Sequence, residues 1–357
     1  MRGPGAGGLE KALEIIRERG SPAQLCVVAR GRIVLNEAFG CQPDSLFFLF
    51  SASKPLVALL VHLLAERGQL ALDDRVAAHW PQFGQHGKQE ITIRQVLQHR
   101  SGLPVVRGMA RDALAMTNWA ASVRALEAAA PSFPPGSVPA YHVLSYGFIL
   151  GELVQRVTGV PVRDVLQSEL LDPLGLRDSY LGLPAGQWHR HVPVAGRGPA
   201  ELATQLMINR QAVRQAVIPA ASVSATAYDL ARLYQALLAG GELDGGRVLQ
   251  PETIRQATSP SSDGEVDRYL KLPVRWSEGF QLGGERAGRT RLGGGSGPMG
   301  ALASPTAFGH NGSYVCIGWA DPQRQVVVGY LTACLVSRPA GARHMAAVSD
   351  AILSEFS

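Results

Sequence analysis

Strand-forming runs lie near both ends of this chain, and this feature most constrains its fold. Near the N-terminus, residues 25–29 and 33–38 are apolar, β-branched runs joined by the turn-like Arg30-Gly31-Arg32. Near the C-terminus, residues 314–320 and 326–331 form a second pair of the same kind. Because a two-stranded hairpin is marginally stable alone, we expect both pairs to join one antiparallel sheet.

Most of the remaining chain has helical spacing of its apolar residues, from a first helix before residue 20, through residues 51 to about 213, to a last helix at the C-terminus. The predicted fold class is therefore α/β, of the α+β type, with an antiparallel sheet flanked by helices from both termini. We expect residues 1–75 and 215–357 to form a discontinuous sheet body. Residues 76–214 are expected to form a mostly helical inserted region, with the catalytic cleft between the two parts.

Composition excludes several classes of protein. The 357 residues are 46% hydrophobic and 18% charged, as in an ordinary globular protein, and the net charge of +5 comes from scattered arginines rather than from a basic run. We therefore expect no nucleic-acid partner. The longest apolar run, residues 55–65, is interrupted by His62 and is too short to cross a bilayer, and no signal peptide is recognisable. With four unclustered cysteines, the chain is expected to be cytoplasmic, with reduced thiols and no membrane partner.

The chemistry starts at Ser51, three residues before Lys54 at the head of an apolar helix pattern. Residues three apart share a helix face, so the Ser51 hydroxyl and the Lys54 amine can meet. A lysine among apolar groups is easily neutral and can then take a proton from serine. In the alternative interpretation Ser51 is a helix N-cap and Lys54 extends to solvent. Ser53 is a competing serine, but it does not share the helix face of Lys54.

Three further motifs follow in order: LQHRSGLP at residues 97–104, Pro135-Gly136 with Tyr141 after four residues, and His310-Asn311-Gly312 leading into a strand. With Ser51 and Lys54, they make the sequence resemble the serine β-lactamase and penicillin-binding-protein superfamily along essentially its whole length. The closest likeness is to the class C β-lactamase-like esterases. The resemblance implies the β-lactamase/transpeptidase-like fold.

The resemblance also implies roles for individual residues. Ser51 would be the acylated nucleophile, Lys54 its activating partner and Tyr141 the proton shuttle, with either Lys54 or Tyr141 as general base. A phenol needs a nearby cation to lower its pKa, and Lys54 is the expected one. The backbone N–H groups of Ser51 and Ser313 would form the oxyanion hole. His310, Asn311, Gly312 and His142 are the predicted substrate-binding residues.

Two departures from the family pattern bear on the substrate. His142 and Val143 stand where β-lactamases carry Ser-Asn, and valine cannot hydrogen-bond an amide side chain. His310 replaces the lysine that would bind a carboxylate. Both changes favour a neutral ester over a penicillin. For His142 a packed histidine at a helix start remains the alternative interpretation, and for His310 a hydrogen-bonded histidine within a strand.

The sequence therefore predicts a serine hydrolase, and most specifically a carboxylesterase for small or medium acyl esters that works through a Ser51 acyl-enzyme. The alternatives are an acyltransferase that uses the same acyl-enzyme, a β-lactamase or D-amino-acid peptidase, and a non-catalytic binding protein. The expected partner is a small-molecule ester or acyl substrate. No cofactor or metal is expected, because His189 and His191 have no Cys, Asp or Glu cluster beside them.

Overall fold

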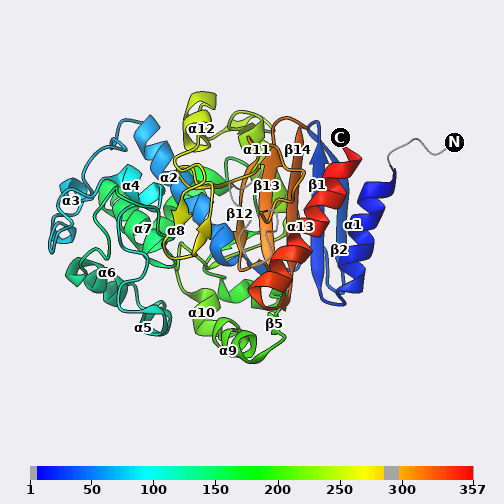
Figure 1. The fold of residues 1–357 in the computed structure, drawn as a ribbon, viewed down its shortest axis with the longest axis horizontal. Coiled ribbons are helices and arrows are strands. Elements are labelled where there is room, and N and C mark those ends of the chain that lie inside the picture. Colours follow the sequence, from blue (N-terminus) through cyan, green and yellow to red (C-terminus); the bar gives the residue numbers. More distant parts are fainter. Residues whose placement is uncertain (1–5, 285–296, 357) are drawn as a thin grey trace.

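The computed structural model describes residues 6–284 and 297–356, and a six-stranded antiparallel sheet forms its centre (Figure 1). The strands lie in the order β11 (Gln281–Leu282), β12 (Phe308–Gly312), β13 (Cys316–Asp321), β14 (Val326–Thr332), β1 (Ala23–Ala29) and β2 (Arg32–Phe39). β1 pairs with β14 from Ala23 opposite Thr332 to Ala29 opposite Val326. The two hairpins thus join one sheet, as the sequence predicts.

The local sequence explains the first hairpin. β1 reads AQLCVVA and is buried along its whole length, as expected for a strand between two neighbours. The turn after it places Arg30 at φ 49° and Gly31 at φ 76°. Two consecutive residues with positive φ give the turn a twist that matches the flanking strands.

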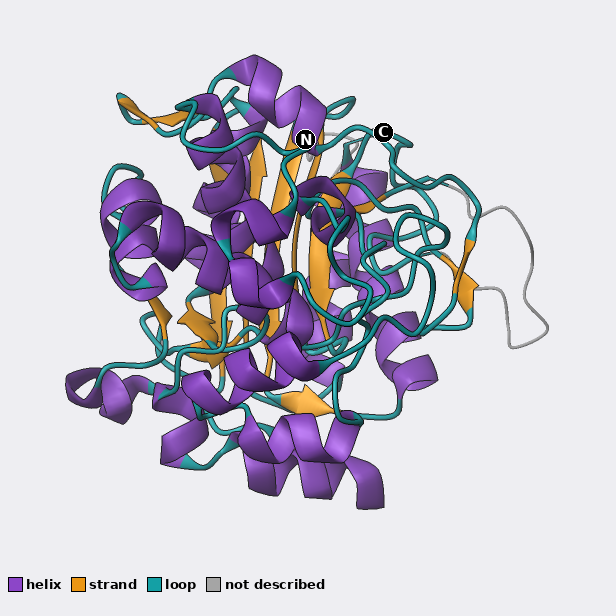
Figure 2. Cartoon of the chain, turned by 90° about the vertical axis from the view of Figure 1, so that its left-hand side faces the viewer, coloured by secondary structure: helices purple, strands orange, loops and turns teal. Residues whose placement is uncertain are grey.

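Helices cover both faces of this sheet. On one face α1 (Ala6–Glu18) and α13 (Arg338–Glu355) pack against each other, and their apolar side chains share a cluster with Val27, Trp319 and Val328 (Figure 1). On the other face α11 (Ala227–Leu238) lies against β1, β13 and β14. Figure 2 shows the strands enclosed by helices on both sides.

The region between the hairpins is mostly helical. Its central helices are α2 (Lys54–Glu66) and α7 (Ser145–Thr158), which contact each other. Their C-cap residues are Arg67 and Gly159, and Gly159 has φ 72°. The other α-helices of the described chain are α3 (Val76–His79), α4 (Ile93–Leu97), α5 (Met109–Ala115), α6 (Trp119–Ala128), α8 (Val162–Leu166), α9 (Pro199–Ile208), α10 (Gln211–Gln215) and α12 (Pro251–Ala257).

Short strands tie this region to the rest of the molecule. β6 (Val223–Ala225) lies between β3 (Phe47–Phe48) and β4 (Ser179–Leu181), and β5 (Ala195–Gly196) pairs with β15 (Cys334–Leu335). Two small hairpins complete the fold, β7 (Glu242–Leu243) with β8 (Gly246–Arg247) and β9 (Val266–Asp267) with β10 (Leu272–Pro273). One hydrophobic cluster includes Leu150 of α7, Leu60 of α2 and Leu331 of β14. Because this core continues through both parts, the predicted domain boundaries at residues 75 and 215 stay a prediction.

No helix in the described ranges combines the length and apolarity that a bilayer span requires. All four cysteines are free thiols, of which Cys41 alone is partly exposed.

Two glycines let α11 approach the sheet closely. Gly318 of β13 and Gly329 of β14 are directly paired across the ladder. A Cβ on Gly318 would lie 2.4 Å from Cε2 of Tyr234, and one on Gly329 would lie 2.4 Å from the carbonyl oxygen of Ala227, both on α11. The two glycines therefore form a shallow groove into which the helix packs.

Replacing Gly329 should consequently destabilise the fold. In Gly329→Ala the new methyl group meets helix backbone that cannot rotate away, and overpacking of this kind costs about 1–3 kcal/mol. Thermal unfolding should show a lowered Tm. Gly186→Ala is the matched control, because no atom lies within 4 Å of the Cβ it would add. Equal Tm values for the two variants would contradict the close packing of α11.

Candidate active site

Ser51 lies in a tight 3-10 turn, Phe50–Ser53, directly before α2. Phe50 has φ 46°, a left-handed conformation that is strained for a bulky residue and that is found mainly where the surroundings enforce it. Ser51 is partly exposed on the wall of a cleft. Its side chain does not cap α2, whose N-cap residue is Ser53. The interpretation of Ser51 as a helix cap is therefore wrong.

Lys54 is fully buried and its amine contacts Ser51. Nζ lies 3.2 Å from Oγ of Ser51, 2.8 Å from the carbonyl oxygen of Val143 and 3.3 Å from that of Ala220. Burial lowers the pKa of Lys54 well below its usual value of 10.5. A neutral amine can donate its two N–H groups to the two carbonyls, which leaves its lone pair for the Ser51 hydroxyl. Lys54 thus does not extend to solvent.

Tyr141 is the third predicted catalytic residue, and it lies beside Ser51 and Lys54. The Nζ of Lys54 lies 4.8 Å from the centre of the Tyr141 ring. Burial raises the pKa of Tyr141 above its usual value of 10, although a hydrogen bond with Ser51 opposes this shift. The expectation that a Lys54 cation lowers this pKa is therefore wrong, because burial disfavours the cation and the phenolate alike. The arrangement favours Lys54 as the base and neutral Tyr141 as a proton donor.

Ser53 stabilises the fold by hydrogen bonding to β6. It is fully buried, and its Oγ accepts the backbone N–H of Val223 at 3.1 Å, which joins the nucleophile turn to β6. Ser53 therefore does not compete with Ser51.

The predicted oxyanion hole lies where β12 meets the nucleophile turn. A Cβ on Gly312 would lie 2.0 Å from the carbonyl oxygen of Leu49 and 2.9 Å from Cβ of Phe50. A glycine is thus required at position 312 because β12 contacts the turn that carries Ser51. The sequence analysis assigned Gly312 to substrate binding instead. Within the described chain, neither Ser51 nor Ser313, which has φ 50°, donates its backbone N–H to a protein acceptor. Their use as an oxyanion hole stays a prediction.

The two residues before Gly312 differ in their access to the cleft. Asn311 lines it, and its amide donates to Oε1 of Gln281 at 2.9 Å. His310 is 1% exposed and its Nδ1 lies 2.7 Å from the carbonyl oxygen of Asn311. Burial, and less strongly Lys54, lower the pKa of His310 to about 3. His310 is therefore neutral at ordinary pH and does not replace the cation of a lysine.

His142 faces away from the cleft. It is fully buried, with Nε2 2.5 Å from Oγ of Ser101 and Nδ1 3.2 Å from Nδ1 of His99. Its pKa is lowered to about 3, chiefly by burial. The prediction that His142 binds substrate does not fit this position, whereas the packed-histidine alternative does. Through His99 and Ser101, the LQHRSGLP motif therefore holds His142, the residue that follows Tyr141.

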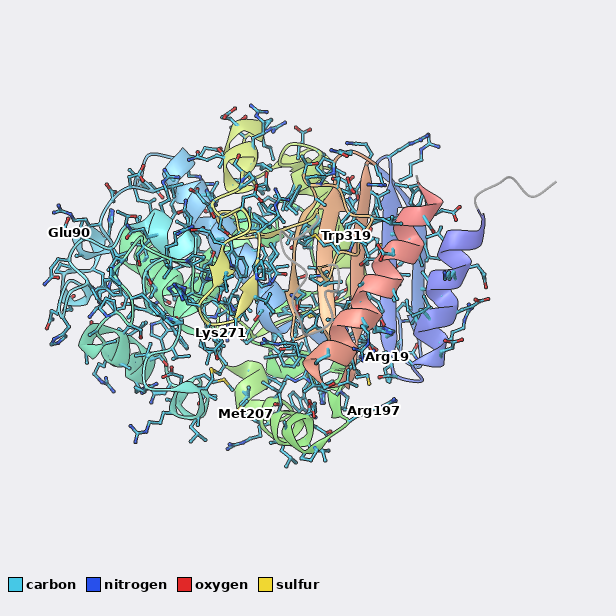
Figure 3. All side chains as sticks on the ribbon, viewed as in Figure 1. Arg19, Glu90, Arg197, Met207, Lys271 and Trp319 are labelled. Carbon is cyan, nitrogen blue, oxygen red and sulfur yellow. The ribbon has the colours of Figure 1, made fainter. Side chains whose placement is uncertain are left out.

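The cleft above Ser51 has a volume of roughly 360 Å³ and is mainly apolar. Val143 lines it, as do residues of α5, α9 and the β9–β10 hairpin. Lys271, labelled in Figure 3, lies between the two strands of this hairpin. The apolar side chains are those of Met109, Val143, Ala200, Leu270, Leu272, Val274, Leu335 and Val336. Sequence reasoning missed most of these residues, because a cleft wall assembled from several loops leaves no periodic pattern.

Two charged residues, Glu201 of α9 and Arg338 of α13, also line the cleft. Arg338 is exposed, and its positive charge opposes the burial that raises the pKa values of Tyr141 and Tyr269. The sequence predicted that the loss of a lysine before Asn311 leaves no cation for a carboxylate. Arg338 provides one at the cleft wall from a different element. No cluster of potential metal ligands was found within the described residues.

A serine and a buried lysine on one turn, with a tyrosine beside them and this sheet topology, define a serine hydrolase of the β-lactamase/transpeptidase-like fold. The β-lactamase family model matches residues 15–351, so the chain belongs to the β-lactamase family. The resemblance seen in the sequence is thereby confirmed.

Known relatives include proteins described as esterases. The chain is 31% identical to the esterase/β-lactamase LipL of Mycobacterium tuberculosis in an alignment 310 residues long, which covers 79% of this chain and 68% of LipL. It is 32% identical to esterase EstB of Burkholderia gladioli in an alignment 191 residues long, which covers 46% of this chain and 48% of EstB. A crystal structure of a family VIII carboxylesterase shares 27% identity and a TM-score of 0.79, with 97% of this chain and 98% of that one covered.

The lowered pKa of Lys54 predicts how the reactivity of Ser51 depends on pH. As the pH falls through that pKa, Lys54 gains a proton and can no longer accept one from Ser51. The rate of Ser51 phosphonylation by a fluorophosphonate should therefore be level above this pKa and fall roughly tenfold per pH unit below it. Intact-protein mass spectrometry across a pH series measures this rate.

Lys54→Arg separates the two candidate bases. A guanidinium stays protonated, so this variant should be unreactive at every pH if Lys54 is the base. If Tyr141 phenolate were the base and Lys54 only its cation, Lys54→Arg would stay reactive. Lys88→Arg is the matched control, because Lys88 is also buried and donates to backbone carbonyls, those of Glu127 and Ala129, far along the chain from Ser51.

Proposed function

We propose that this protein is a carboxylesterase that hydrolyses small or medium acyl esters through an acyl-enzyme on Ser51. The observation that carries the proposal is the contact between the buried amine of Lys54 and Oγ of Ser51 beside a mainly apolar cleft. The descriptions of LipL, EstB and the family VIII carboxylesterase support it. A cleft of this volume suits an acyl chain of modest length.

The contacts suggest a sequence of proton transfers for acylation. Oγ of Ser51 attacks the ester carbonyl while Lys54 takes the hydroxyl proton, and the backbone N–H groups of Ser51 and Ser313 hold the oxyanion. When the C–O bond to the alcohol breaks, Tyr141 gives its proton to the leaving oxygen. Lys54 then returns a proton to Tyr141, so the amine and the phenol are both restored.

Deacylation uses the same groups with water in place of the alcohol. Water loses a proton toward Lys54 and attacks the acyl carbon, and Ser51 leaves as its hydroxyl after regaining a proton. An alcohol or amine in the position of water would make the protein an acyltransferase. That alternative is compatible with the same residues, but no contact among the described cleft residues favours it over hydrolysis.

The choice of ester over β-lactam rests on Val143 and His310. Val143 lines the cleft without a hydrogen-bonding group, and the low pKa of His310 keeps its imidazole uncharged. Arg338 gives the cleft a cation, so the absence of a lysine before Asn311 is no longer an argument by itself. A cytoplasmic location and the absence of a nucleic-acid or membrane partner stay predictions.

Ser51→Ala should abolish ester hydrolysis while leaving the fold intact. Loss of a nucleophile typically lowers kcat by on the order of 10³-fold or more. Hydrolysis of p-nitrophenyl butyrate and a thermal melt measure the two properties. Ser53→Ala is the matched control: it should lower Tm, because the buried N–H of Val223 loses its acceptor, but it should keep most of the activity. Retention of turnover by Ser51→Ala would disprove the assignment of the nucleophile.

The second expectation concerns the class of substrate. The value of kcat/KM for p-nitrophenyl butyrate should exceed that for nitrocefin or benzylpenicillin by ~10²-fold or more, because a β-lactam loses the amide contact that Val143 cannot make. Side-by-side kinetics measure this ratio. Comparable values for nitrocefin and p-nitrophenyl butyrate would make the protein a β-lactamase instead. Arg338→Ala tests the cation separately, since turnover of the carboxylate-bearing β-lactams should fall more than turnover of p-nitrophenyl butyrate.

A further inference from the structure

Asp267, the last residue of β9, is a fully buried carboxylate that forms no ion pair within the described residues. Four N–H groups of the protein donate hydrogen bonds to this carboxylate instead. Oδ1 accepts the backbone N–H groups of Tyr141 at 3.1 Å, Tyr269 at 2.9 Å and Leu270 at 2.8 Å. Oδ2 accepts the indole N–H of Trp276 at 3.1 Å. A buried charge is tolerated when it is hydrogen-bonded in this way, and these bonds make Asp267 a junction between the Tyr141 loop and the cleft wall.

Trp276 connects this junction to the phenol ring of Tyr141. Its ring lies parallel to that of Tyr141, with 5.4 Å between the centres and 7° between the planes. Trp276 is itself fully buried, and its backbone N–H donates to Oγ of Ser262 at 3.1 Å. On the other side, the ring of His99 lies 4.6 Å from Trp276 and 4.9 Å from Tyr141. The phenol is therefore held by an indole whose own orientation is fixed by Asp267.

Tyr141 needs such support because its own segment provides little. It lies in a loop between α6 and α7, outside any helix or strand. A proton donor must stay within hydrogen-bond reach of the leaving oxygen, and misplacement by about 1 Å can cost on the order of 10²-fold in rate. Asp267 fixes the backbone of Tyr141, while Trp276 fixes the plane of its ring.

We propose that Asp267 and Trp276 are positioning residues that hold the Tyr141 phenol for proton transfer to the leaving alcohol. This inference rests on the proposed esterase function and deepens it. It predicts that the enzyme depends on Asp267 and Trp276 when the alkoxide anion of the ester is a poor leaving group and must receive a proton from Tyr141.

The leaving group provides a readout that a general loss of stability would not change. An alkyl alcohol needs a proton as the C–O bond breaks, whereas p-nitrophenol leaves readily as its anion. If acylation is compared through kcat/KM for methyl butyrate and p-nitrophenyl butyrate, the acyl group and its pocket are the same in both. A variant that misplaces Tyr141 should therefore lose more activity on the methyl ester than on the aryl ester.

The experiment compares three variants with wild type and with Tyr141→Phe as the reference for complete loss of the donor. Asp267→Asn keeps an oxygen for the backbone N–H groups but turns its amide N–H toward the indole N–H. Trp276→Leu removes the stacked ring. In both, the methyl/aryl ratio of kcat/KM should fall about 10-fold or more, since general acid catalysis by a positioned group contributes roughly 10²–10⁴-fold.

The double variant Asp267→Asn/Trp276→Phe tests the link between the two residues. The phenylalanine restores a ring against Tyr141 and removes the indole N–H that opposes the asparagine amide, so the ratio should recover toward wild type. A ratio lower than that of Asp267→Asn would contradict the link. This variant also keeps the test informative if Trp276→Leu does not fold, which thermal melts will show.

Trp319→Phe is the matched control, because Trp319 is an equally buried tryptophan whose indole has no hydrogen-bond partner and lies in the separate core under α1 and α13 (Figure 3). Its methyl/aryl ratio should equal that of wild type. Equal losses on both esters in Asp267→Asn and Trp276→Leu would overturn the positioning role alone. Failure of wild type to hydrolyse either ester would overturn the proposed function, and this inference with it.

Discussion

The contact between the Lys54 amine and the Ser51 hydroxyl is the interaction on which the rest of the structure depends. Removing an amine from water is costly unless its hydrogen bonds are replaced. The replacements come from the carbonyls of Val143, just before α7, and Ala220, just before β6. Three segments that are distant in the sequence must therefore meet at one nitrogen atom. The sheet, α2 and α7 together hold the Lys54 amine and its two carbonyl partners in place and bury the amine away from water.

Close backbone approaches make this arrangement possible. A Cβ on Gly147 would lie 2.1 Å from the backbone nitrogen of Ala220, so this glycine allows α7 to reach the segment that supplies a carbonyl to Lys54. Gly312 plays the same part between β12 and the turn that carries Ser51. Both glycines are needed because of contacts within the protein: Gly147 lies against the residue whose carbonyl contacts Lys54, and Gly312 lies against the turn that carries Ser51.

Some of this arrangement could be predicted from the sequence, for physical reasons. The Ser51–Lys54 contact depends on residues three apart, and the two hairpins depend on local periodicity, so the contact was predicted and the hairpins were predicted with bounds close to those observed. Tyr141 was found only through the family resemblance. Asp267 and Arg338 were not predicted, because the contact of Asp267 with Tyr141 and the place of Arg338 in the cleft wall both join segments more than 100 residues apart. His142 was misassigned because its neighbours His99 and Ser101 lie on a separate loop.

The buried lysine and histidines around Ser51 all have lowered pKa values. His142 and His310 each have a pKa near 3, lowered by burial and then by Lys54, and the pKa of His99 is lowered as well. Burial alone lowers that of Lys54. Burial thus disfavours the charged form of each of these bases, and charge on one of them disfavours charge on the others. In the acylation step that we propose, Lys54 takes the proton of Ser51 while His142 and His310, with pKa values near 3, stay uncharged, and Tyr141 is the proposed proton donor to the alcohol. On this proposal, the lowered pKa values of the three histidines favour placing the new positive charge on Lys54, whose nitrogen contacts the nucleophile.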